Sequence, residues 1–126
     1  MKIEFCVTSI EGAIAAEQFK ADRIELCSRL DLDGLTPSLN LIKQCRLEYA
    51  GEIHVMIRPE DGPFICNDYT LRKMQDSIVQ SAEMGINGVV FGILNDNNQI
   101  NLKATASLVE IAHKYNFEIF SQLKNI

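Results

Sequence analysis

Residues 23–27 read Arg-Ile-Glu-Leu-Cys, so that Ile24 and Leu26 alternate with charged or sulfur-bearing side chains. This alternation is typical of a β-strand that packs one face and leaves the other for a different environment. A helix start follows at residues 34–38, where we expect Thr36 to cap the helix and Pro37 to occupy its first position. A strand that leads into a helix in this way is the repeating unit of parallel α/β folds.

The same unit recurs along the chain. Short runs rich in β-branched and aromatic residues lie far enough apart for a helix and two loops to separate them. These runs are residues 3–7, 23–27, 53–58, 89–93 and 117–120. The expected helix caps are Thr8, Thr36, Asp68 and Asn101. The sequence therefore predicts an α/β fold of four βα units and a short fifth strand, all within a single domain of residues 1–126.

The polar face of these strands distinguishes between two α/β architectures. In a doubly wound sheet helices cover both faces, whereas a barrel strand turns one face toward the lumen. The apolar residues suited to the helix-covered side are Ile3, Phe5, Val7, Ile24, Leu26, Val55 and Ile57. The opposite face would hold Glu4, Cys6, Arg23, Glu25, Cys27, His54, Met56 and Arg58. A face this polar indicates a lumen or a site, and we predict a partial TIM-type (β/α)8 barrel.

Charge and composition narrow the range of partners. The 126 residues carry a formal net charge of -5, and the basic residues do not cluster, so neither nucleic acid nor an anionic membrane is an expected partner. No apolar run is as long as a membrane span, and the first residues do not resemble a signal peptide. We therefore expect a cytoplasmic protein whose four cysteines remain thiols.

Sulfur-bearing side chains lie where α/β barrels place their chemistry, at the carboxyl ends of the strands. Cys6 and Cys27 end the first two predicted strands on the same face, and Met56 lies near the end of the third. Thiolate and thioether sulfurs are the soft ligands that select Cu(I). Cys66, in the loop after the third strand, is a further candidate ligand. The alternative is that these residues are ordinary packing residues, as cysteine and methionine often are.

Charged residues at the same end allow a second interpretation. Glu25 and Arg58 are weak candidates for catalysis: Arg58 can hold a carboxylate or phosphate, and Glu25 can act as a general base. The alternative is that they form a buried ion pair. His54 is expected to be a core histidine with its hydrogen bonds satisfied, His113 to lie at a helix end, and Cys45 to be buried.

Several of these segments, in this order and spacing, resemble the copper homeostasis protein CutC family. They are residues 5–9, 21–28, 34–38, 55–59 and 88–92. The resemblance implies a TIM barrel, a cytoplasmic role in copper homeostasis, and Cu(I) binding by the two strand-end cysteines, here Cys6 and Cys27. It leaves open whether the protein is also an enzyme.

The sequence departs from the family pattern in two places. Residues 60–64 replace a basic, glycine-rich stretch, and residues 121–126 replace a segment that carries a histidine, an arginine and an aspartate. The length is also about half of the roughly 250 residues of a complete barrel. Two alternatives follow: a half barrel that self-associates through open sheet edges, or a truncated and inactive CutC-like fragment.

Overall fold

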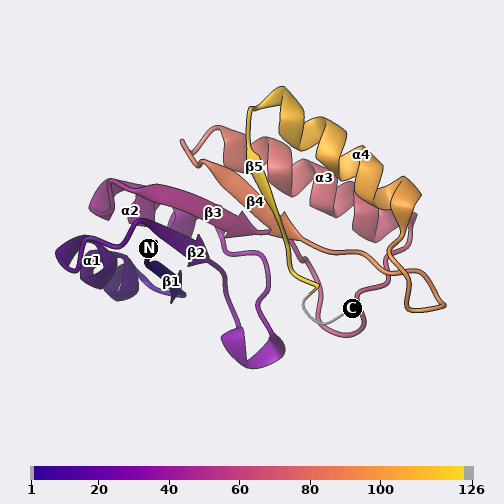
Figure 1. Cartoon of the computed structure of the whole chain (residues 1–126), viewed down its shortest axis with the longest axis horizontal. Coiled ribbons are helices and arrows are strands. Elements are labelled where there is room, and N and C mark those ends of the chain that lie inside the picture. Colours follow the sequence, from indigo (N-terminus) through magenta and orange to yellow (C-terminus); the bar gives the residue numbers. More distant parts are fainter. Residues whose placement is uncertain (1, 124–126) are drawn as a thin grey trace.

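The computed structural model describes residues 2–123, which alternate between strands and helices (Figure 1). The elements are β1 (Glu4–Val7), α1 (Ile10–Gln18), β2 (Arg23–Leu26), the 3-10 turn η1 (Leu30–Leu32), α2 (Leu39–Glu48), β3 (Glu52–Met56), α3 (Asp68–Ala82), β4 (Gly88–Phe91), α4 (Leu102–Lys114) and β5 (Glu118–Ser121). The predicted strands and the helices between them are confirmed. The departure expected at residues 121–126 lies partly outside the described residues.

The strands form one parallel sheet whose spatial order, β1-β2-β3-β4-β5, follows the order in the chain. A doubly wound sheet reverses its strand order at a switch point, and no such reversal occurs among the described strands. Figure 1 shows α1 and α2 beside the first strands and α3 and α4 beside the last, all on the same side of the sheet. This arrangement is that of a barrel wall.

The hydrophobic core lies between the sheet and the helices. Strand residues Ile24, Leu26, Ile53, Val55 and Val89 are fully buried there. Their helix partners in the same cluster are Ala13, Ala16, Ile42, Ile78, Leu108 and Ala112. Each large aliphatic side chain removed from water contributes about 1.5–3 kcal/mol. The packing of these alternate strand residues against the helices explains the alternation in the sequence and confirms which strand face meets the helices.

Three helices begin close to, but not at, the predicted capping residue. The side chains that accept a hydrogen bond from the first turn are Ser9, Ser38, Asn67 and Asn101. Only the prediction for Asn101 is correct, because Thr8, Thr36 and Asp68 lie one or two residues away from the observed caps. Thr36 is used elsewhere: its hydroxyl accepts a 2.8 Å hydrogen bond from the backbone nitrogen of Arg58. Pro37 accordingly precedes α2.

The helices are modest in length. None of those in residues 2–123 is long and apolar enough to cross a membrane.

Candidate functional site

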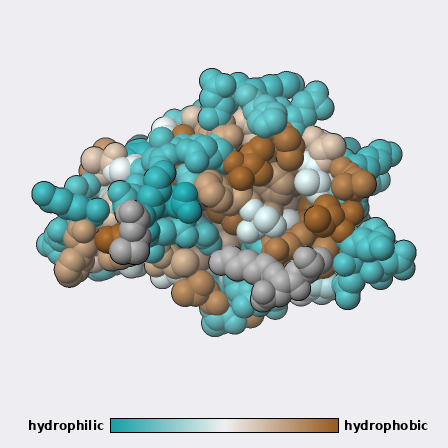
Figure 2. All heavy atoms as spheres, in the orientation of Figure 1, coloured by the Kyte–Doolittle hydropathy of each residue, from teal (hydrophilic) through white to brown (hydrophobic). Residues whose placement is uncertain are grey.

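The sheet face turned away from the helices carries its side chains in rows, because the parallel strands are in register. One row, from β1 to β5, consists of Cys6, Glu25, His54, Gly88 and Glu118. The next row toward the carboxyl ends contains Met56, Val90 and Phe120, which pack with Cys27 in a small second cluster. Figure 2 shows hydrophobic atoms where β4 and β5 lie and mainly hydrophilic atoms where β2 and β3 lie.

Cys6 and Cys27 lie on adjacent strands but are staggered. Cys6 is the register partner of Glu25, so Cys27 lies two residues farther toward the carboxyl end. With about 3.3 Å per residue and about 4.8 Å between strands, their Cα atoms are about 8 Å apart. A disulfide requires less than about 7 Å, and both residues are thiols. Because Cys6 is exposed and Cys27 is buried, the pair consists of an accessible thiol beside a shielded one.

The Cys27 thiol is held in a poorly hydrated environment. Its residue is 1% exposed, and burial raises its pKa to about 11, with further contributions from Cys6 and Glu25. Met56, 3% exposed, belongs to the same cluster. Gly34, at φ +92, covers both side chains: a Cβ there would lie 3.2 Å from Met56 Cε and 3.6 Å from Cys27 Sγ. Cys27 is therefore a neutral thiol near pH 7.

The remaining two cysteines face the helix side of the sheet. Cys45 is fully buried in the helix-side core, as predicted, and its sulfur lies 3.8 Å from the carbonyl oxygen of Ser9. Cys66 is half-buried and packs against the same core. The structure thus packs Cys27 with Met56 and places Cys6 on the strand next to Cys27, while the candidate ligand Cys66 belongs to a different cluster.

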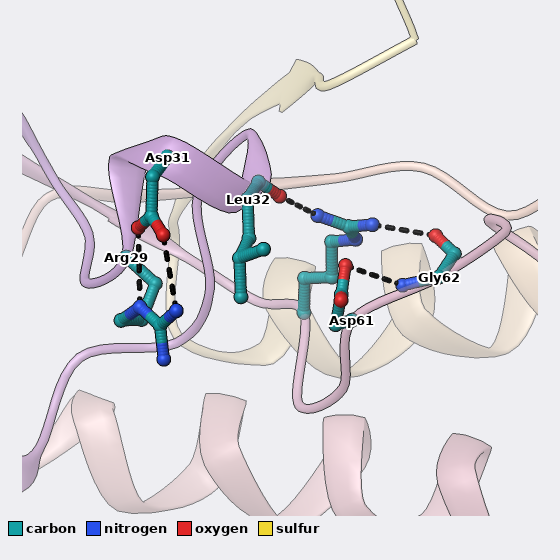
Figure 3. A network of polar contacts seen from close by, with 6 residues as sticks. Arg29, Asp31, Leu32, Asp61 and Gly62 are labelled. Carbon is teal, nitrogen blue, oxygen red and sulfur yellow. Dashed lines mark hydrogen bonds and ion pairs between the residues drawn. The ribbon is translucent and has the colours of Figure 1, made fainter.

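Arg58 joins the loop after β2 to the loop after β3 through Leu32 and Gly62, which are labelled in Figure 3. Its guanidinium donates to the carbonyl oxygen of Leu32 at 2.6 Å and to that of Gly62 at 2.6 Å, with a longer bond of 3.4 Å to Gly34. The ring of Phe64 lies 4.5 Å below it in a cation–π contact. Instead of an ion pair with Glu25, these main-chain carbonyls surround the charge.

A cavity of about 410 Å³ lies between α3 and the segments that follow β3 and β4. Its lining includes Arg58, Phe64, Cys66, Thr70 and Met74. Glu25, the other candidate for catalysis, lies on the lumen face between Cys6 and His54 and does not line this cavity. The structure therefore separates the two charged residues that the sequence placed together.

His54 differs from the prediction. It is 1% exposed, as expected of a core histidine, but its Nε2 has no hydrogen-bond partner among the described residues. Two nearby residues, Glu52 and Glu118, were not identified as site candidates from the sequence. The signal was present, because Glu52 continues the alternation of His54 and Met56 by one step toward the strand start.

We predict that the free energy of unfolding falls as the pH rises from about 9 to about 11. Burial raises the pKa values of Cys27, Cys45, Cys66 and Tyr49, so the folded chain keeps protons that the unfolded chain has lost. The stability that these groups contribute is fully present below their pKa in the unfolded chain, and it is lost as the pH rises through their pKa in the folded chain. Urea titrations across this range should show a shallower decline in both Cys27→Ser and Cys27→Ala, and an unchanged slope in both would contradict this explanation.

Solved structures share this architecture. The CutC protein of Streptococcus agalactiae, named a copper homeostasis protein, superposes with a TM-score of 0.86 and 31% identity, covering 96% of this chain and 59% of that chain. A D-tagatose 3-epimerase-like protein has the same fold, at a TM-score of 0.64 and 19% identity over 96% of this chain and 52% of that chain. The fold and the placement of the site define a partial TIM-type barrel protein.

Comparison of the amino-acid sequence with protein families identifies the family of this chain. The model of the CutC family matches residues 1–121, and the chain belongs to that family. A CutC protein of Glaesserella parasuis is 42% identical over 110 residues, which is 87% of this chain and 45% of the relative. One from Mesorhizobium japonicum is 38% identical over 114 residues, covering 90% and 44%. The chain spans about half the length of these curated relatives.

Proposed function

We propose that this chain binds copper, as Cu(I), through Cys6 and Cys27 at the carboxyl ends of the strands, and that it serves copper homeostasis in the cytoplasm. The observation that carries the proposal is the sulfur cluster of Cys27 and Met56, beside which Cys6 lies on the neighbouring strand. The membership of the CutC family and the name of the Streptococcus agalactiae relative support the same function.

The chemistry of the cluster suits a soft, monovalent ion. Two thiolates and one thioether are the sulfur ligands that favour Cu(I) over hard cations. The exposed Cys6 provides access from solvent, and the buried Cys27 and Met56 provide a shell with little water. Because binding must displace the proton of Cys27, the affinity is expected to rise with pH.

The alternative of an enzyme that acts on a small anionic substrate is less well supported. It depends on Arg58 as the anion-binding group, yet two nitrogens of that guanidinium donate to loop carbonyls. Glu25 is also absent from the cavity that Arg58 lines. An anionic ligand would have to compete with these carbonyls for Nη1 and Nη2, while the buried Nε–H of Arg58 has no hydrogen-bond partner among the described residues.

We expect an anaerobic Cu(I) titration against a chromophoric chelator to show one bound ion per chain. Cys6→Ser and Cys27→Ser should each weaken the affinity at least about tenfold, since loss of a mere supporting partner already costs about 10- to 100-fold. Met56→Leu, which conserves volume, should weaken it less. The matched control is Cys45→Ser, which removes a thiol from the opposite face of the sheet and should leave the affinity unchanged.

The double variant Cys6→Ser/Cys27→Ser decides the proposal. Equal affinity in this variant and in the wild type would exclude the strand-end thiols as ligands. A Cys66→Ser variant tests the additional ligand predicted from the sequence. An inactive fragment would instead show no Cu(I) binding in the wild type and a broad, poorly cooperative thermal melt.

A further inference from the structure

A second group of potential ligands lies nearer the amino ends of the strands than Cys27 and Met56. Glu52 opens β3 and Glu118 opens β5, and His54 lies two residues into β3. One ligand atom from each of the three side chains lies within 4.8 Å of the other two. Along β3, at about 3.3 Å per residue, Glu52 lies about 13 Å and His54 about 7 Å before Met56, so this group occupies a different level of the same sheet face from the sulfur cluster.

Gly88 allows the group to assemble across an intervening strand. It is the register partner of both His54 and Glu118, and it lies between them on β4. A Cβ at Gly88 would lie 2.9 Å from His54 Cδ2, the ring carbon bonded to Nε2, and 3.2 Å from the Cβ of Glu118. The imidazole and Glu118 therefore both lie against a position that has no side chain.

His54 is prepared to donate a lone pair. Its Nε2 is buried and has no hydrogen-bond partner among residues 2–123, which is costly for a polar atom. The ring stacks on Phe120 with centroids 4.6 Å apart, so its orientation is fixed.

The carboxyl groups of Glu52 and Glu118 lie close enough to interact. A hydrogen bond with Glu118 raises the pKa of Glu52, and burial and repulsion between the carboxylates add to the effect. The neighbouring charges are mixed: Arg23 pairs with Glu4 at 2.5 Å, and Lys2 also lies close enough to act on both Glu52 and His54. A divalent cation placed among these three side chains would lie next to two carboxylates and offset the repulsion between them.

We propose that Glu52, His54 and Glu118 form a site for a divalent first-row transition-metal ion such as Zn²⁺, distinct from the sulfur cluster. One imidazole nitrogen and two carboxylate oxygens are ligands that Zn²⁺ accepts, and Cu(I) prefers sulfur. Glu118 is exposed and Glu52 half-buried, so solvent can reach the site and supply a further ligand. Two neighbouring levels of the same sheet face would thus select ions of different softness.

The test uses Zn²⁺ titrated into the Cys6→Ser/Cys27→Ser chain, in which the sulfur cluster is disabled, by isothermal titration calorimetry. We expect one ion per chain, with the affinity reduced at least about tenfold in Glu118→Gln and in Glu52→Gln. Glu110→Gln, which alters a glutamate on α4 far from the site, is the matched control and should bind as its parent does. Bound Co²⁺ should show the absorption spectrum of nitrogen and oxygen ligands without thiolate charge transfer.

Each outcome decides the proposal. Absence of Zn²⁺ binding in the parent, binding that persists in both glutamine variants, or a thiolate spectrum with Co²⁺ would overturn it. Circular dichroism shows whether the variants are folded; if Glu118→Gln is not, Glu52→Gln decides. Since the parent lacks Cys6 and Cys27, failure here is independent of the Cu(I) result.

Discussion

Replacing Arg58 by alanine is expected to lower the free energy of unfolding by about 3–4 kcal/mol. Its guanidinium is the shared donor for carbonyls of two loops, at 2.6 Å to Leu32 and 2.6 Å to Gly62, and it stacks on Phe64. Hydrogen bonds to a charged group contribute about 1.5–3 kcal/mol each. The longer bond to Gly34 would also be lost, and both loops would lose a restraint at the same time.

Urea denaturation at neutral pH measures this loss. Arg58→Lys should recover only part of it, because an ammonium group cannot reproduce the planar fork that reaches carbonyls on two sides. Arg72→Ala removes an exposed arginine from α3 and should change stability by less than about 0.5 kcal/mol. Similar values for Arg58→Ala and Arg72→Ala would show that the loops do not depend on this contact.

Arg58 also shows what the sequence could and could not predict. The sequence predicted Arg58 at the end of the third strand, and in the structure it lies two residues beyond β3. Alternation also predicted the burial of the strand face that packs against the helices. Its partners did not, because they are main-chain carbonyls, which every residue carries and no motif marks. The sequence instead suggested Glu25, an acidic residue predicted on the same sheet face. A sequence identifies charged side chains as possible partners, but it does not show which backbone carbonyls lie nearby.

The cysteines illustrate a second limit. Alternation was enough to predict that Cys6, Cys27 and Met56 share a face, and the structure confirms that Cys27 and Met56 pack together. Alternation does not determine how neighbouring strands are aligned, however. In the structure Cys6 is aligned with Glu25, which places Cys27 two residues farther toward the carboxyl end. The covering position of Gly34 depends on a loop conformation at φ +92 that no local pattern specifies.

The group formed by Glu52, His54 and Glu118 was not predicted from the sequence, for a related reason. They come from strands that are not adjacent, so their proximity depends on the absence of a side chain at Gly88. From the sequence alone, a glycine at the start of a strand indicates only a residue that contributes little to strand stability. Its role is visible only when the registers of three strands are known together.

Gly88→Ala is therefore expected to destabilise the chain by about 2–3 kcal/mol, near the upper end of the usual cost of overpacking. The new Cβ would lie 2.7 Å from the backbone carbonyl oxygen of Glu118 and 2.9 Å from the ring of His54. The carbonyl belongs to β5, so the clash can be relieved only by moving that strand or by twisting the imidazole off Phe120.

Thermal and urea melts of Gly88→Ala measure the cost, and Gly62→Ala is the matched control. Gly62 has φ +105, and a Cβ at this position would have no neighbouring atom within 4 Å, so alanine there adds only backbone strain of about 1 kcal/mol. Hydrogen exchange should show faster exchange in β5 of Gly88→Ala, where the displaced strand pairs with β4. Wild-type stability in Gly88→Ala would mean that β4 and β5 adjust freely, and it would remove the structural basis for the close approach of His54 and Glu118.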